Sequence, residues 1–260
     1  MKEVVAIIPA RMGSSRFPGK PLADIHGMPM IGHVYLRTRM AELLTDTYVA
    51  TCDQEIYDYI VSIGGKAVMT ADTHERCTDR TAEAMLKIEQ ETGKRIDIVV
   101  MVQGDEPMVT PEMITTSVAP LLADSSVKVV NLMAEMATVT EFEDPNEVKV
   151  VVDLSGKALY FSREPIPSRK KGVTEVPMYK QVCIIPFQRD YLLAFNNMPE
   201  TPMERIESVD MMRILEHGDT VQMVMTKTLS LSVDTSADLD RVRELMCDDL
   251  LMASYKTGVS

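Results

Sequence analysis

Hydrophobic positions in the first half of the chain follow two different periods. Apolar runs that end in polar residues are typical of buried strands and occur at 4–8, 47–53 and 97–105. Between them, apolar residues recur at helical spacing over 31–44, 54–63 and 78–91. This alternation predicts an α/β fold in which helices cover both faces of a mostly parallel sheet. Such sheets bind ligands at the carboxyl ends of their strands.

The pattern changes from about residue 125 onward. Short apolar stretches with turn signals between them predict an antiparallel or mixed sheet and occur at 127–136, 146–153, 157–163 and 179–187. The proline-bearing, basic segment 164–178 predicts an exposed loop. Helices are expected at 202–216 and 236–249, around a last strand at 221–228, with Ser236 as the N-cap of the final helix. We therefore expect one domain over 1–250, β-rich from about 130 to 200, and a C-terminal tail at 251–260.

Composition narrows the class of protein. The chain has 260 residues, a net charge of −12 and four scattered cysteines. An acidic balance disfavours binding to nucleic acid or to an anionic membrane surface, because both require surplus Lys and Arg. No signal-peptide pattern opens the chain, and no apolar run approaches the roughly 20 residues of a membrane helix. We expect a cytoplasmic protein with reduced thiols.

A basic loop directly follows the first apolar run, at residues 9–22. Its small residues allow main-chain amides to approach an anion, and they are Gly13, Ser14 and Ser15. Its cations are Arg11, Arg16 and Lys20, within a frame stiffened by prolines. The loop is neither a G-x-x-x-x-G-K-[ST] nor a G-x-G-x-x-G motif. A solvated surface loop is the plain alternative, but a nucleoside triphosphate explains the combination better.

Carboxylates follow a second apolar run, in the sequence VQGDEPMV at 102–109. Asp105 falls at the carboxyl end of that predicted strand, where it suits Mg²⁺ bound jointly by protein and phosphate oxygens. A short apolar run before Asp234 predicts another strand, and Asp234 is a candidate for the second carboxylate that binds the metal ion. An acidic turn and a helix cap are the respective alternatives.

Short motifs spread along nearly the whole chain carry a family likeness. They are Pro9-Ala10-Arg11, Ser15-Arg16-x-Pro18-Gly19-Lys20-Pro21-Leu22, His74, Thr78-Asp79-Arg80, Val102-Gln103-Gly104-Asp105-Glu106-Pro107, Pro145-Asn146-x-Val148-Lys149, Ala158-Leu159-Tyr160-Phe161-Ser162-Arg163, Pro202-x-Glu204-x-x-Glu207, Leu215-Glu216 and Val233-Asp234-Thr235. In this order they resemble the signature of the 3-deoxy-manno-octulosonate (Kdo) cytidylyltransferases, also called CMP-Kdo synthetases. The combination is far more specific than any one motif.

The resemblance implies a Rossmann-like nucleotidyltransferase fold and transfer of CMP from CTP to an acidic sugar with release of pyrophosphate. It implies a homodimer formed through the β-rich part. The implied nucleotide-binding residues are Ala10, Arg11, Gly13, Ser14, Ser15, Arg16, Lys20, Thr78, Arg80, Gln103 and Gly104. The implied catalytic residues are Lys20, Asp105 and Arg11, and Asp105 and Asp234 would bind Mg²⁺. The implied acceptor-binding residues are Gln103, Arg163, Gln181, Glu207, Asp210 and Met211.

The acceptor half departs from the family pattern. Gln181 replaces a His and Met211 replaces a Gln, so a cation and an amide are lost. Arg76 and Cys77 replace Ser and Gly near the expected cytosine end, whereas Arg163 is retained and could pair with an acceptor carboxylate. An acceptor other than Kdo, such as a modified octulosonate, a sialic-type acid or a phosphonate, is one reading. Neutral change with Kdo retained is the other.

Three other classes of protein fit the sequence less well. Sugar-1-phosphate nucleotidyltransferases share the strand and basic loop, but their loop carries a G-x-G-T-R pattern that this chain lacks. A catalytically silent CTP-binding protein would need neither Asp105 nor Asp234. A Rossmann dehydrogenase is disfavoured because no G-x-G-x-x-G follows any predicted strand.

Overall fold

The computed structural model describes residues 2–14 and 16–256. The chain divides into two compact units, which are described separately. The first unit comprises residues 1–115 and 229–260, and the second comprises residues 116–228. The boundaries of the single domain expected from the sequence stay a prediction.

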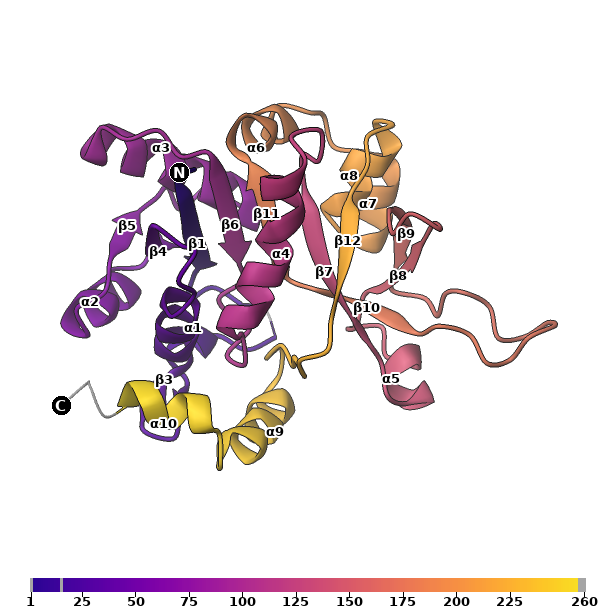
Figure 1. Cartoon of the computed structure of the whole chain (residues 1–260). Coiled ribbons are helices and arrows are strands. Elements are labelled where there is room, and N and C mark those ends of the chain that lie inside the picture. Colours follow the sequence, from indigo (N-terminus) through magenta and orange to yellow (C-terminus); the bar gives the residue numbers. More distant parts are fainter. Residues whose placement is uncertain (1, 15, 257–260) are drawn as a thin grey trace. The chain divides into compact units, whose positions relative to one another are not determined.

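A parallel sheet forms the centre of the first unit (Figure 1). Its strands lie in the order β6 Ile98–Val102, β1 Val4–Ala10, β4 Asp46–Thr51 and β5 Ala67–Met69. All three pairings are parallel, and every residue of β1 and β6 is buried. The continuous apolar runs are therefore central strands, which confirms the α/β prediction.

Helices connect these strands and contribute to the core of the first unit. They are α1 Met30–Arg39, α2 Gln54–Ser62 and α3 Cys77–Thr92, with the short elements η1 Lys20–Leu22, β2 Asp24–Ile25 and β3 Met28–Pro29 before α1. Helix α1 ends five residues before the predicted boundary at Leu44. The apolar spacing continues, but residues 40–44 form tight turns, and the Thr45 N–H then donates to the Val4 carbonyl at 2.7 Å.

Two C-terminal helices complete the first unit, α9 Ser236–Met246 and α10 Leu250–Lys256. The N-cap of α9 is Thr235 rather than the predicted Ser236, because Thr235 forms a reciprocal capping box with Asp238. On α1, His33 Nδ1 lies 2.6 Å from the Tyr255 hydroxyl, and Arg37 Nη1 lies 2.7 Å from Asp249 Oδ2. Residues 251–256, expected in a tail, thus belong to a helix that contacts α1.

A mixed sheet forms the centre of the second unit, as the sequence predicts. Its order is β12 Gln222–Thr226, β7 Val130–Glu135, β10 Tyr179–Val182, β8 Lys149–Val152 and β9 Ala158–Ser162. Strand β12 is parallel to β7, and the other pairings are antiparallel. The turn between β8 and β9 needs Gly156, whose φ is 77°.

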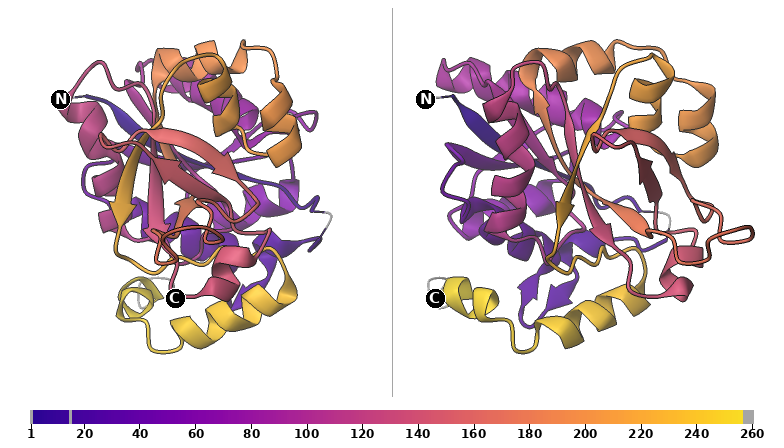
Figure 2. Two further views of the ribbon diagram at one scale, coloured as in Figure 1. Left: turned by 90° about the vertical axis from the view of Figure 1, so that its right-hand side faces the viewer. Right: turned by 45° about the vertical axis from the view of Figure 1, so that its right-hand side comes forward.

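The remaining elements are β11 Ile184–Gln188, α4 Pro111–Ala123, α5 Val139–Glu143, α6 Arg189–Asn196, α7 Pro202–Glu207 and α8 Met211–Glu216. The single helix predicted at 202–216 is two helices, because Ser208 adopts a left-handed conformation with φ 53°. A buried ion pair between Arg213 and Glu204, at 2.6 Å, then joins α8 to α7. The predicted loop at 164–178 runs from the end of β9 to the beginning of β10 and projects from the second unit (Figure 2).

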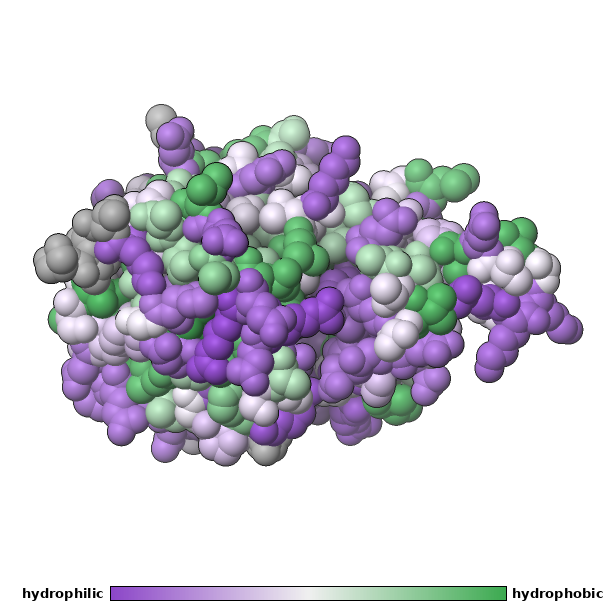
Figure 3. Space-filling view, turned by 90° about the horizontal axis from the view of Figure 1, so that it is seen from below, coloured by the Kyte–Doolittle hydropathy of each residue, from purple (hydrophilic) through white to green (hydrophobic). Residues whose placement is uncertain are grey.

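Polar side chains cover most of the face shown in Figure 3, with hydrophobic ones scattered among them. No helix among the described residues is long and apolar enough to cross a membrane.

Candidate functional site

The basic loop after β1 folds back on itself within the first unit. The Met12 amide donates to Asp53 Oδ2 at 2.8 Å, and the Gly19 amide donates to the Met12 carbonyl at 3.0 Å. Gly19 adopts φ 77°, a left-handed conformation that glycine reaches without strain. This reversal brings the chain to Lys20, the first residue of η1. Ser15 lies outside the described residues.

Asp105 lies in the turn that follows β6, where the Glu106 amide donates to the Gln103 carbonyl at 3.2 Å. The turn packs closely against β1, since a Cβ placed on Gly104 would lie 3.0 Å from the Pro9 carbonyl oxygen. Glu106 is buried and accepts a hydrogen bond from Ser230 Oγ at 2.6 Å. Close packing and a buried hydrogen bond thus fix the position of Asp105.

Asp234 reaches this turn without the strand that the sequence predicts before it. Residues 230–235 form no strand, so Asp234 does not follow one. Instead, the Val233 amide donates to the Asp105 carbonyl at 2.9 Å. The Asp234 amide then donates to Asp238 Oδ2 at 3.1 Å, at the N-terminus of α9. One main-chain hydrogen bond and one capping residue bring Asp234 to Asp105.

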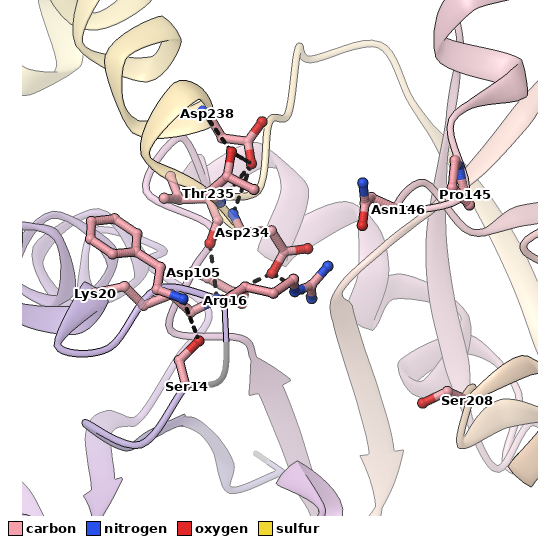
Figure 4. A network of polar contacts seen from close by, with 12 residues as sticks. Ser14, Arg16, Lys20, Asp105, Pro145, Asn146, Ser208, Asp234, Thr235 and Asp238 are labelled. Atoms are coloured by element: carbon pink, nitrogen blue, oxygen red, sulfur yellow. Dashed lines mark hydrogen bonds and ion pairs between the residues drawn. The ribbon is translucent and has the colours of Figure 1, made fainter.

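Lys20 joins the two aspartates (Figure 4). Its Nζ lies 2.6 Å from Asp105 Oδ2, 3.3 Å from Asp234 Oδ1 and 2.9 Å from the Val233 carbonyl oxygen. Arg16 Nη2 also lies 2.9 Å from Asp234 Oδ1. Burial alone lowers the pKa of Lys20, but the two carboxylates outweigh it and raise the pKa above its ordinary value. Lys20 is therefore a cation in this cluster.

The Asp105 carboxylate is only partly satisfied. Its Oδ2 accepts from Lys20, whereas its Oδ1 is buried and has no hydrogen-bond partner among the described residues. A buried carboxylate oxygen without a partner is costly, and a cation is the natural ligand for it. No group of three or more His, Cys, Asp or Glu side chains that could hold a metal occurs in the described part of the chain. Two carboxylates alone match cations that complete their coordination shell with oxygens from other molecules.

The other cations predicted in the first unit contact different partners. Arg11 is exposed, and its Nη1 donates to the His74 carbonyl at 3.4 Å. Arg80 is 3% exposed, and its Nη1 donates to Thr70 Oγ1 and to the Ala71 carbonyl. Arg80 Nη2 is buried without a hydrogen-bond partner among the described residues. Ala10 ends β1, Thr78 is buried in α3, and a Cβ on Gly13 would meet open space.

Predicted acceptor-binding residues belong to the second unit, apart from Gln103. The Arg163 amide donates to Glu207 Oε2 at 2.9 Å, and Arg163 Nε donates to the Glu207 carbonyl at 2.8 Å. Gln181 Nε2 donates to Asn131 Oδ1 at 2.5 Å. Met211 is 1% exposed, and Asp210 is the N-cap residue of α8. The structure thus brings Arg163 and Glu207 together and holds Gln181 against Asn131.

Two residues that support this cluster and its loop are not predicted from the sequence. Asp53, which holds the basic loop through the Met12 amide, follows β4 just as Asp105 follows β6, so the same strand-end signal applied to it. Asp238 is not predicted either, because an N-cap at Ser236 would place the helix start one residue later. The pattern Thr235-x-x-Asp238 is a capping box and could have been found.

Comparisons of the sequence with known proteins all identify cytidylyltransferases. The sequence profile of the cytidylyltransferase family matches residues 5–229. The 3-deoxy-manno-octulosonate cytidylyltransferase of Geobacter metallireducens is 42% identical, over 93% of this chain and 97% of that protein. The enzyme of that name from Syntrophus aciditrophicus is 43% identical, over 95% of this chain and 98% of its own length.

Solved structures agree with the sequence comparisons. The structure of a CMP:2-keto-3-deoxy-manno-octonic acid synthetase complexed with CTP has a TM-score of 0.87 and 38% identity. That match covers 96% of this chain and 100% of the other. A Leptospira borgpetersenii cytidylyltransferase, with a TM-score of 0.63 and 16% identity, shares the fold.

Proposed function

Because the chain belongs to the cytidylyltransferase family, and within it to the 3-deoxy-manno-octulosonate cytidylyltransferases, we propose that it transfers CMP from CTP to Kdo and releases pyrophosphate. The observation that carries the proposal is the convergence of Lys20 on Asp105 and Asp234 at the carboxyl end of β6. These three residues come from distant parts of the sequence, and the fold of one unit brings them together.

The first unit would bind the triphosphate of CTP. Arg16 and Lys20 supply positive charge beside the basic loop, and exposed Gly13 leaves room for an anion to approach the main chain. All three N–H groups of Lys20 now point to protein oxygens, so Lys20 must exchange at least one of them to contact a phosphate. Arg80 Nη2, buried and without a partner in the described structure, is a donor suited to a nucleotide oxygen.

Asp105 and Asp234 would hold Mg²⁺, consistent with the unpartnered Asp105 Oδ1. When bound, the ion supplies positive charge that offsets the repulsion between carboxylates and phosphates. The protein itself aligns the reactants, so that the acceptor oxygen attacks the α-phosphorus in line with the departing pyrophosphate. Electrostatic stabilisation by Arg16 and Lys20 contributes where negative charge develops.

The second unit would supply the acceptor contacts. Arg163, beside Glu207, would supply positive charge for the Kdo carboxylate. We favour Kdo over a phosphonate or a sialic-type acid, because relatives more than 40% identical over nearly the whole chain are named for Kdo. The replacements at Gln181 and Met211 then adjust the acceptor half without changing the substrate.

Pyrophosphate release tests the proposed activity. Purified protein would be assayed with Mg²⁺, with each of CTP, UTP, dTTP and ATP, and with Kdo, amino-Kdo, sialic acids, phosphonates and sugar 1-phosphates as acceptors. We expect turnover with CTP and Kdo, with the other pairs far slower. Binding of CTP without turnover on any acceptor would identify a silent binding protein, and a preference for sugar 1-phosphates would place the chain in the other nucleotidyltransferase class.

We also propose that the protein is a cytoplasmic homodimer assembled through its β-rich part. Strand β9 is an edge strand of the second sheet and carries Leu159, which is 61% exposed. An exposed apolar residue on such a strand suits contact with a second copy. Light scattering coupled to size-exclusion chromatography would give the mass, and a Leu159→Lys variant that stays dimeric would contradict this interface.

A further inference from the structure

Lys149 is a buried lysine that the proposed reaction does not use. It begins β8 and is 0% exposed. Its Nζ donates to the main-chain carbonyls of Asp144 and Glu147, both at 2.8 Å, and to that of Arg163. An ammonium group has three N–H donors, so these carbonyls satisfy it completely. The side chain therefore serves main-chain oxygens rather than substrate or solvent.

The three carbonyls require the charged form of Lys149. Burial, assisted by the positive charge of Arg163, lowers the pKa of Lys149 below its ordinary value, although the nearby acidic side chains partly oppose that effect. A neutral amine has two N–H donors and would leave one of the three carbonyls unpaired. Lys180, its partner in register on β10, differs, because its Nζ pairs with the carboxylates of Glu141 and Glu147 at 2.7 and 3.0 Å.

The carbonyls that Lys149 binds flank one of the groups to which the Arg163 guanidinium donates. Arg163 Nη1 donates to the Pro145 carbonyl at 3.0 Å, between the two carbonyls at 144 and 147 that Lys149 holds. Lys149 also holds the carbonyl of Arg163 itself. One buried ammonium thus fixes both the main chain of Arg163 and the segment to which its side chain donates.

We propose that Lys149 is a positioning residue for the acceptor carboxylate, acting through Arg163. This inference rests on the proposed role of Arg163 in binding Kdo. Without the ammonium, carbonyls on both segments lose their donor, and the Pro145 contact that orients Nη1 of Arg163 is loosened, while the contact of Arg163 Nε with the Glu207 carbonyl remains. Misplacement of a binding group by about 1 Å costs up to about a hundredfold in rate.

The test is a double-mutant cycle with Lys149→Met, Arg163→Met and the double variant. Pyrophosphate release would be measured against Kdo at saturating CTP, and against CTP at saturating Kdo. We expect Lys149→Met to raise the KM for Kdo about tenfold or more while the KM for CTP changes less than about twofold. Because Lys149 acts through Arg163, the double variant should be no worse toward Kdo than Arg163→Met alone.

Two controls separate positioning from general destabilisation. Val150→Ala, on the same strand and at a 0% exposed position, removes packing and keeps the ammonium, so its KM for Kdo should match wild type. Lys149→Ala leaves space for propylammonium, which should restore the KM for Kdo, whereas 1-propanol should not. If Lys149→Met does not fold, Lys149→Gln, which has two donors, gives the same readouts.

The outcomes distinguish the inference from the proposed function. An unchanged KM for Kdo in Arg163→Met would overturn the role of Arg163 on which the inference depends. A raised KM in Arg163→Met with an unchanged KM in folded Lys149→Met or Lys149→Gln would overturn the inference alone. Equal losses toward CTP and Kdo, or additive effects in the cycle, would show that Lys149 is merely structural.

Discussion

Acidification is expected to destabilise the first unit through His33. This histidine is 0% exposed, and its ring contacts the Tyr255 hydroxyl through Nδ1 and the Ile25 carbonyl through Nε2. A neutral imidazole matches these partners, since one nitrogen donates to the carbonyl and the other accepts from the hydroxyl. Burial, assisted by the positive charges of Arg37 and Lys256, lowers the pKa of His33 from 6.5 to about 4.

The sign and size of the effect follow from this shift in pKa. The unfolded chain takes up the proton at higher pH than the folded chain, so the stabilisation is fully present above pH 6.5 and is lost as pH falls toward about 4. A shift of about 2.5 units corresponds to at most about 3 kcal/mol, and between about pH 7 and pH 5 the loss is about 2 kcal/mol.

Urea unfolding followed by circular dichroism measures this loss. Wild type and His33→Gln would be compared at about pH 7 and pH 5, with the difference in free energy of unfolding taken for each protein. We expect His33→Gln to lose about 2 kcal/mol less than wild type on acidification. His217→Gln is the matched control, because His217 is exposed, and it should behave as wild type. If His33→Gln and wild type lose the same free energy, the reasoning about His33 is wrong.

Three other substitutions test the nucleotide half. Asp105→Asn should abolish Mg²⁺-dependent turnover while the circular dichroism spectrum stays native, and full activity would refute the metal assignment. Lys20→Met should raise the Kd for CTP by about tenfold or more in calorimetry, because a partly buried cation is lost; an unchanged Kd would count against its phosphate role. Gly104→Ala should lower the free energy of unfolding by about 1–3 kcal/mol, because the added Cβ would lie 3.0 Å from the Pro9 carbonyl oxygen and 3.2 Å from Ile31 Cδ1. A neutral result in urea unfolding would show that the turn can relax.

The elements of the fold that the sequence predicts well are those fixed by local periodicity. Strands β1, β4 and β6 are buried on both faces, so their continuous apolar runs are visible without tertiary information. The break between α7 and α8 is not local in this sense. Apolar spacing continues through Ser208, and the turn there accompanies the buried pair of Arg213 with Glu204, which sequence spacing does not specify.

The candidate site shows the same division. Lys20 and Asp105 are predictable because each lies in a loop that follows the carboxyl end of a strand, where α/β sheets bind ligands. The approach of Asp234 to Asp105 depends on a single hydrogen bond between the main-chain groups of Val233 and Asp105. Such a bond between irregular segments cannot be predicted from the pattern of side chains along the sequence. The sequence shows Lys149 only as part of a family motif. Its role as a donor to main-chain carbonyls depends on its burial in the folded chain, which the sequence does not show.

The charges of the site support the proposed metal-binding role of its two aspartates. Arg16 and Lys20 carry two positive charges, and Asp105 and Asp234 carry two negative ones, so these four side chains cancel. A triphosphate that enters this neutral cluster brings its own negative charge, which the four residues alone cannot offset. A divalent cation held by Asp105 and Asp234 would supply the positive charge that the four residues lack, and CTP binding should improve with it. Removing one aspartate should weaken the dependence of CTP affinity on Mg²⁺ and strengthen metal-free CTP binding, because Lys20 then lacks a competing partner.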